Sequence, residues 1–254
     1  MASGCACPRL FCPERPNLRN ERFEIELRAT PEEVWRSLTT SEGLASWFGT
    51  RAEVEARVHG ERVVGWGEGE EIRGRITDLE PLERIRVVYL ADGEEVGAEE
   101  WLITTDSTTT RLTLINSMPD EGIDDWEGFY GDMRRGWRLF LASLHHGFDE
   151  AATPYRQVEH VMVPTPGPRG PIRERLDRCL ANQEALVSAM TTTLSDPPHS
   201  LLLTARDRTL LLDIEGAGDS QVLYVQAATH GGAADWPKQV VEAIGSCVGR
   251  NDSQ

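Results

Sequence analysis

The chain has 254 residues, of which 39% are hydrophobic and 27% are charged, so it can bury one large core or two smaller ones and is too apolar to be disordered throughout. Its formal net charge is −16 at pH 7, and an acidic surface repels nucleic acid and anionic lipid alike. No stretch has the length and apolarity of a transmembrane helix. We therefore expect no nucleic-acid partner and no insertion into a membrane.

Residues 1–20 show no periodicity and are predicted to form a flexible leader. They lack the basic start and the apolar run of a signal peptide, and five cysteines are a low and odd count, so we expect a reducing, cytoplasmic location. Three of these cysteines, Cys5, Cys7 and Cys12, lie in the leader. A structural zinc site needs four ligands at more regular spacing, and no metal site is predicted.

The first ordered elements are predicted from residue 23 onward. Alternating apolar and acidic residues over 23–27 predict a strand. Thr30, Pro31 and Glu33 have the spacing of a capping box with proline in the first helical turn, and a second short helix is expected from Ser41. Turn signals then separate six candidate strands, at 51–58, 61–67, 71–79, 83–91, 97–105 and 108–116.

A long amphipathic helix is predicted over residues 124–148, where the period changes from two to about 3.6. Its apolar stripe consists of Trp126, Tyr130, Met133, Trp137, Phe140, Leu141 and Leu144. The predicted fold class is therefore α+β, with a curved antiparallel sheet wrapped around a long C-terminal helix. Such a sheet leaves an interior between itself and the helix in which a ligand can lie.

Five motifs, in this order and spacing, resemble the START-like (SRPBCC) superfamily. They are Ala29-Thr-Pro-Glu-Glu-Val-Trp-Arg-Ser-Leu-Thr, Leu44-Ala-Ser-Trp-Phe, Gly74-Arg-Ile-x-x-Leu-Glu-Pro, Thr110-Arg-Leu-Thr-Leu and Gly136-Trp-x-x-Phe-Leu-x-x-Leu. More narrowly, the chain looks like the bacterial homologues of the activator of the heat-shock-protein-90 ATPase. The resemblance covers residues 21–150 and implies a helix-grip fold with an internal cavity.

The resemblance also implies a range of functions. Members of the superfamily bind lipids, hormones or polyketides, and a few act as cyclases or as self-resistance proteins for reactive natural products. We expect this chain to bind or sequester a small hydrophobic or amphipathic molecule. The alternatives are a cyclase- or aromatase-type enzyme that uses the same cavity, and a chaperone-associated or regulatory protein-interaction module.

The expected ligand-binding residues are mainly aromatic, because six of the seven tryptophans lie in the first 150 residues. For any single one of them the favoured interpretation is that it fills the core, but as a group they can fill the core and line a cavity. Asn116 is a polar residue on the expected inner face, where it can orient a ligand, and Met118 follows it toward the entrance. The full predicted set is Trp47, Tyr89, Trp101, Asn116, Met118, Trp126, Tyr130 and Trp137.

The remaining candidates for chemistry are weak. The acidic pairs at 94–95 and 99–100 are interpreted as a solvated face, and the adjacent histidines His145 and His146 point about 100° apart on a helix. The superfamily has no universal catalytic residue to carry over. We therefore predict no catalytic residue, no cofactor and a binding protein rather than an enzyme, with a homodimer or a protein partner as a further possibility.

The rest of the chain is predicted as a second, smaller unit. Five prolines make residues 151–171 a stiff linker, and residues 172–250 read as a small α+β domain. It has a helix with Ile172, Leu176, Leu180, Val187 and Met190 at helical spacing, then three strands and a final helix from about residue 235 to 248. The order of these elements resembles the end of the first domain, so the unit is a candidate degenerate half-repeat.

Overall fold

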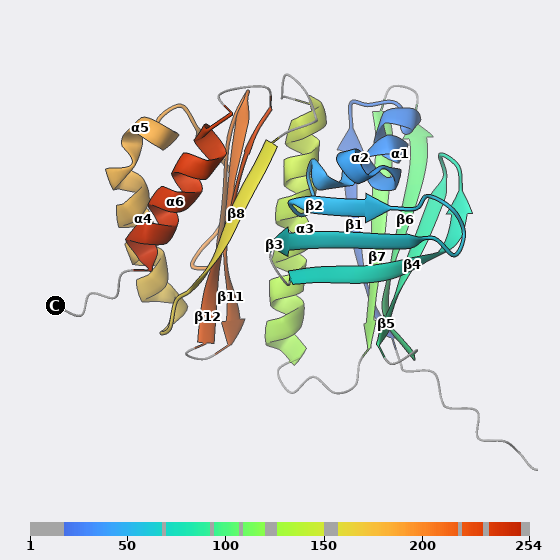
Figure 1. The fold of residues 1–254 in the computed structure, drawn as a ribbon, viewed down its shortest axis with the longest axis horizontal. Helices are drawn as coiled ribbons and strands as arrows, with labels where there is room; N and C mark the ends of the chain where they lie inside the picture. Colours follow the sequence, from blue (N-terminus) through green and yellow to red (C-terminus); the bar gives the residue numbers. More distant parts are fainter. Residues whose placement is uncertain are drawn as a thin grey trace, which may run out of the picture.

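The computed structural model describes residues 18–67, 70–91, 94–106, 109–119, 126–149, 157–217, 220–230 and 234–249. Four layers lie side by side in Figure 1: a first sheet, one long helix, a second sheet and a pair of helices. We call residues 18–149 the first half and residues 157–249 the second half. The long helix, α3 (Trp126–Asp149), belongs to the first half and is covered by a sheet on each side.

Sheet A, in the first half, is an antiparallel sheet of seven strands in the order β1-β7-β6-β5-β4-β3-β2. Its strands are β1 (Leu18–Leu27), β2 (Arg51–Val54), β3 (Glu61–Gly67), β4 (Glu70–Glu80), β5 (Arg84–Ala91), β6 (Glu94–Asp106) and β7 (Thr109–Pro119). The predicted strands all occur, and the pairing of β1 with β7 brings the start of the half beside its last strand. Together with α3 this is the helix-grip fold that the resemblance implies.

Two short helices, α1 (Pro31–Thr39) and α2 (Ser41–Ala45), follow the first strand as predicted. The capping box is confirmed: the Thr30 hydroxyl accepts from the backbone N–H of Glu33, whose carboxylate accepts from the backbone N–H of Thr30. Both helices add side chains to a common core with sheet A and α3. Trp47 lies at its centre, edge-on to Trp101 at a centroid distance of 5.7 Å.

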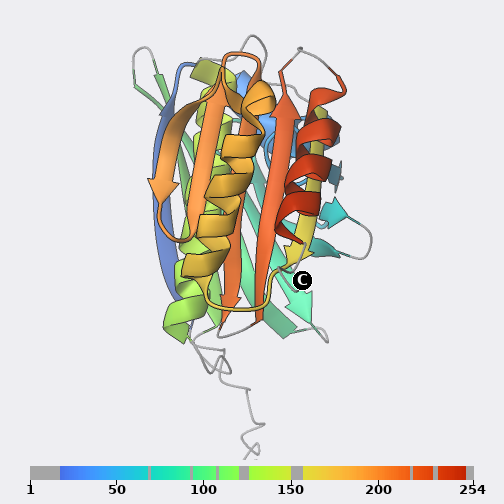
Figure 2. The ribbon, with the colours of Figure 1, turned by 90° about the vertical axis from the view of Figure 1, so that its left-hand side faces the viewer.

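Sheet B, in the second half, is an antiparallel sheet of five strands in the order β8-β12-β11-β10-β9. Its strands are β8 (Gln157–Pro164), β9 (Thr191–Asp196), β10 (Ser200–Ala205), β11 (Arg208–Ala217) and β12 (Ser220–Thr229). Its outer face packs on α4 (Arg169–Asn182) and α6 (Trp236–Val248), which lie in front of the sheet and run roughly along its strands in Figure 2, and α5 (Glu184–Val187) follows α4. A disulfide between Cys179 and Cys247 joins α4 to α6, although the cysteine count indicated no such bond.

The predicted linker at 151–171 is wrong over most of its length. Residues 157–164 form β8, which pairs with β12, and α4 begins at Arg169. The prolines predicted a linker, but they do not interrupt the strand or the helix. Pro164 is the last residue of β8, Pro166 and Pro168 lie between β8 and α4, and Pro171 lies in the first turn of α4. The helix predicted after the linker also ends early, at Asn182, and residues 191–196 form β9, an edge strand rich in threonine.

Helix α3 is buried on two faces, whereas the predicted apolar stripe accounts for only one buried face. Trp137, Leu141 and Leu144 face sheet A, whereas Leu139 on the opposite face packs with Leu202, Leu211 and Tyr224 of sheet B. No helix in the described residues is long and apolar enough to span a membrane.

Candidate functional site

An open pocket of about 340 Å³ lies between sheet A and α3. We call it the grip cavity. Its walls are mostly apolar, with a few polar groups among them, as is typical of sites for small molecules. The lining residues are Phe48, Ile72, Arg73, Tyr89, Val96, Glu99, Asn116, Met118, Met133 and Trp137.

Two glycines in neighbouring strands leave room for this cavity. Tyr89 on β5 is paired with Gly74 on β4 and with Gly97 on β6, so its ring has no side chain directly opposite on either side. A Cβ at Gly74 would lie 2.4 Å from Cγ1 of Val87 and 3.0 Å from the ring of Tyr89. The missing side chains therefore let the tyrosine ring lie across the strands.

A buried carboxylate, Glu99, forms the polar floor of the grip cavity. Its Oε2 accepts from Arg62 Nη1 at 2.6 Å and from Trp101 Nε1 at 3.1 Å, and its Oε1 accepts from the Tyr89 hydroxyl. The side chains of Arg62 and Glu99 are only 4% and 2% exposed. Burial and the charge of Glu99 raise the pKa of Tyr89 well above its ordinary value, so the hydroxyl stays protonated and donates.

Three donors hold Glu99, and this limits the chemistry available to it. A carboxylate that accepts from a guanidinium, an indole and a phenol at once has no free position suited to take a proton from a substrate. A buried ion pair of this kind fixes the positions of its members. We therefore interpret the cluster as a rigid support for the cavity wall.

Asn116 presents the cavity with an acceptor that has no partner. The side chain is 4% exposed, and among the described residues its Oδ1 accepts no hydrogen bond. It lies on β7, directly opposite Glu99 of β6 and so on the same face of the sheet. A buried acceptor without a partner is costly, and a ligand that donates to it recovers that free energy.

The structure separates the predicted site residues into three groups. Tyr89, Asn116, Met118 and Trp137 line the grip cavity. Trp47 and Trp101 fill the core instead, each 1% exposed. Tyr130 is buried at the start of α3, where its hydroxyl lies 3.5 Å from the carbonyl of Arg19, and the side chain of Trp126 lies outside the described residues.

Glu99 and Arg62 were not predicted as site residues, because the acidic pair at 99–100 was interpreted as a solvated face. Glu100 does lie at the surface, paired with Arg84, but Glu99 points inward with Trp101 and Ile103. The two-residue period of the strand was the available signal. It was overlooked because an isolated glutamate is rarely buried.

Among the described residues, no group of three or more histidine, cysteine, aspartate or glutamate side chains could hold a metal ion. Cys5, Cys7 and Cys12 lie outside the described residues. The helix-end residue His146 is buried, and its Nε2 lies 2.8 Å from the carbonyl oxygen of Ala205 in sheet B. It therefore helps to join the two halves.

Comparison with solved structures finds weak likenesses. The Aha1 dimer from Colwellia psychrerythraea is 20% identical with a TM-score of 0.45, over 52% of this chain and 96% of that one. DynU16, described as a protein of the dynemicin biosynthetic locus, is 18% identical with a TM-score of 0.45, over 91% of this chain and 96% of that one. CalU16 from Micromonospora echinospora is 20% identical with a TM-score of 0.40, over 49% of this chain and 72% of that one.

Among curated proteins, the search found no sequence that matches the chain. A family model does match: residues 28–149 fit the family described as Activator of Hsp90 ATPase homolog 1-like protein. These residues run from the end of β1 to the end of α3 and so contain the elements that enclose the grip cavity. Residues 28–149 therefore form a domain that matches the family of the Activator of Hsp90 ATPase homolog 1-like protein.

Proposed function

We propose that the first half binds a small amphipathic molecule in the grip cavity. The observation that carries this proposal is a largely apolar space of about 340 Å³ that contains one buried acceptor without a partner among the described residues, Asn116 Oδ1. The ligand would place its apolar body against Phe48, Met133 and Trp137 and donate a hydrogen bond to Asn116.

Binding is favoured over catalysis by the state of the polar groups. A cyclase-type reaction needs an acid or a base that is free to exchange a proton with the substrate. Glu99 is held by three donors, and the pKa of Tyr89 is raised by burial and by the Glu99 charge. The polar groups of the cavity therefore support recognition.

A fluorescent probe and one bulky substitution test the proposal. N-phenyl-1-naphthylamine is neutral at pH 7, apolar and carries one N–H donor, so it should bind the wild-type protein with increased emission. Met133→Trp fills the cavity from α3 and should weaken probe binding at least about tenfold, since it removes most of the available volume. Asn116→Leu should weaken it less, by the loss of one hydrogen bond.

Arg138→Trp is the matched control, because Arg138 lies on the same helix with an exposed side chain. It should leave probe affinity unchanged. If the probe binds Met133→Trp as tightly as the wild type, or does not bind the wild type at all, the grip cavity is not the site. Circular dichroism of each variant checks that the fold is retained.

A further inference from the structure

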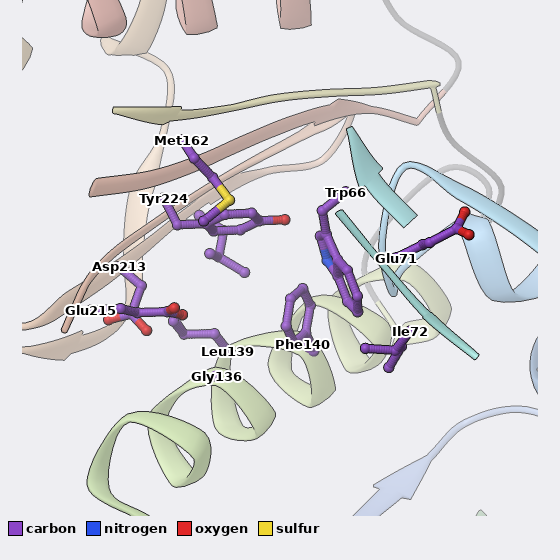
Figure 3. A pocket seen from close by; sticks show the side chains of 11 residues that line it. Trp66, Glu71, Ile72, Gly136, Leu139, Phe140, Met162, Asp213, Glu215 and Tyr224 are labelled. Carbon is purple, nitrogen blue, oxygen red and sulfur yellow. The ribbon is translucent and has the colours of Figure 1, made fainter. Parts of the chain in front are cut away.

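A second pocket, of about 440 Å³, lies between the two halves of the molecule. We call it the interlayer pocket. It is bounded by β3 and β4 of sheet A, by α3, and by the face of sheet B that is turned toward α3 (Figure 3). The lining residues are Trp66, Glu71, Ile72, Gly136, Leu139, Phe140, Met162, Leu211, Asp213, Glu215 and Tyr224.

Aromatic rings form much of its wall. The rings of Trp66 and Phe140 have a centroid distance of 6.4 Å, and those of Phe140 and Tyr224 one of 6.3 Å. In Figure 3 Tyr224 and Met162 stand on one side of the space, with Trp66 and Phe140 on the other. A flat apolar group that enters here meets ring faces and edges and a polarisable sulfur atom.

At the far end of the pocket lies a carboxyl group without a partner. Asp213 is 1% exposed, and neither of its oxygens has a hydrogen-bond partner in the part of the chain that the structure describes. Glu215, two residues further along β11, lines the pocket on the same side (Figure 3). A buried carboxyl group without a partner costs free energy that the fold of the chain alone does not recover.

The charged groups around Asp213 favour a cation over an anion. Three carboxylates and the Asp213 carboxyl group stand beside two guanidinium groups in this region, and Arg135 and Arg169 are both paired with Asp132. Burial, and then the charge of Glu215, raise the pKa of Asp213 to about 8, although Arg135 acts in the opposite direction. The groups concerned are Asp132 and Arg135 on α3, Arg169 on α4, Asp196 on β9, and Asp213 and Glu215 on β11, with His199 beside them.

We propose that the interlayer pocket is a second binding site, which takes a small arylalkylamine, a flat aromatic ring joined through a methylene group to a basic amine: the ring lies among Trp66, Phe140, Tyr224 and Met162, and the ammonium group donates to Asp213. Binding removes the proton from the Asp213 carboxyl group and releases it to solvent, leaving an ammonium–carboxylate pair inside the pocket. This pair replaces an acceptor without a partner by a charge-assisted hydrogen bond. The site adjoins the grip cavity, with which it shares Ile72, and does not depend on its function.

The test compares 1-naphthylmethylamine, a cation at pH 7, with 1-naphthalenemethanol, a neutral molecule of the same shape, by isothermal titration calorimetry. The wild-type protein should bind the amine at least about tenfold more tightly than the alcohol. Asp213→Asn should remove this preference, because the amide carries no charge to pair with the ammonium group. In the wild-type protein, amine binding should release close to one proton at pH 7, seen by repeating the titration in buffers of different ionisation enthalpy.

Two further variants keep the test decisive. Trp66→Leu removes one aromatic wall and should weaken amine and alcohol alike, which shows that the pocket is the site even if Asp213→Asn does not fold. Met133→Trp alters the grip cavity and should leave amine affinity unchanged. The proposal is overturned if the amine does not bind at millimolar concentration, if it binds no better than the alcohol, or if Asp213→Asn and Trp66→Leu both bind it like the wild type.

Discussion

At the residue scale, the most unusual group in the molecule is Asp213. It belongs to a row across sheet B in which directly paired residues of all five strands face α3, namely Met162, Tyr224, Asp213, Ser200 and Asp196. Ser200 is 1% exposed, and its hydroxyl also has no partner among the described residues. A sheet face with this composition packs poorly by apolar contact alone, which is why a pocket persists between the halves.

Asp213 should make stability depend on pH. Its pKa is raised in the fold to about 8, so the folded protein holds a proton that the unfolded chain has lost above about pH 4. A carboxyl group with a raised pKa contributes most stability at low pH, and this contribution falls by up to about 1.4 kcal/mol per pH unit as the pH rises toward 8. The free energy of unfolding of the wild type should therefore decrease relative to Asp213→Asn between pH 5 and pH 8.

Urea denaturation of both proteins at the two pH values measures this difference directly. Because the variant keeps the shape of the side chain and cannot ionise, the titrating groups that do not interact with Asp213 cancel in the comparison. The expected change in the stability difference is about 2–4 kcal/mol, in favour of the variant at pH 8. Two proteins whose stabilities follow the same pH profile would show that Asp213 titrates normally.

At the scale of single elements, the space inside sheet A depends on the glycine in β4. Gly74→Ala places a Cβ 2.4 Å from Cγ1 of Val87 and 3.0 Å from the Tyr89 ring, so either the side chains or the strand must move. We expect a loss of about 1–3 kcal/mol in the free energy of unfolding and weaker binding of N-phenyl-1-naphthylamine, because Tyr89 would be displaced toward the grip cavity.

Gly136→Ala in α3 is the matched substitution, for which we expect no loss in the free energy of unfolding. A Cβ at Gly136 has no neighbour within 4 Å, and alanine favours a helix interior over glycine by about 0.5–1 kcal/mol. Urea denaturation should show this variant to be as stable as the wild type or more so. Equal effects of the two substitutions would contradict the packing account of Gly74.

At the scale of the whole molecule, one carboxylate joins the halves. Asp132 of α3 accepts from Arg169 Nη2 at 3.0 Å and from the backbone N–H of Gly216 at 3.1 Å, both in the second half, and also pairs with Arg135. Its side chain is 19% exposed, so solvent screens these contacts only in part. The second half is thus held by polar contacts to the same helix that closes the grip cavity.

Asp132→Asn should therefore weaken the contact between the halves. Two guanidinium groups lose a shared counter-charge in a partly buried place, and we expect a loss of about 2–3 kcal/mol and a broader thermal transition in scanning calorimetry as the halves begin to unfold separately. Asp177→Asn is the control, because Asp177 is 55% exposed and, within the part of the chain that the structure describes, pairs only with Arg173 of its own helix. It should change stability by less than about 0.5 kcal/mol.

The arrangement of the second half supports the proposal of a degenerate repeat. In sheet A the first strand, β1, lies beside the last, β7, and the other strands follow in reverse chain order from β6 to β2. Sheet B has the same pattern: β8 lies beside β12, and β11, β10 and β9 follow. In each half the last strand is followed by an amphipathic helix, α3 or α6, that packs on the sheet. We propose that residues 157–249 are a shortened second copy that lacks the counterparts of β2 and β3.

The sequence by itself determined the parts of this protein that local chemistry specifies. The capping box at Thr30, the alternation in the meander and the apolar stripe of α3 each report contacts within a few residues or the face of one element, and they predicted the first half and Asn116 on its inner surface. Only the tertiary structure decided which segments pack on the second face of α3 and which strand pairs with β8. β8 was hidden because its hydrogen bonds go to β12, far along the chain.

The same reason explains the two buried carboxyl groups. Glu99 and Asp213 carry no local sign of burial, since a charged residue in a strand is usually at the surface. One is held by donors from β3, β5 and its own strand, and the other becomes buried only when α3 covers sheet B. Their surroundings are set by segments distant in sequence, and for that reason both pockets owe their polar chemistry to the packing of the whole chain.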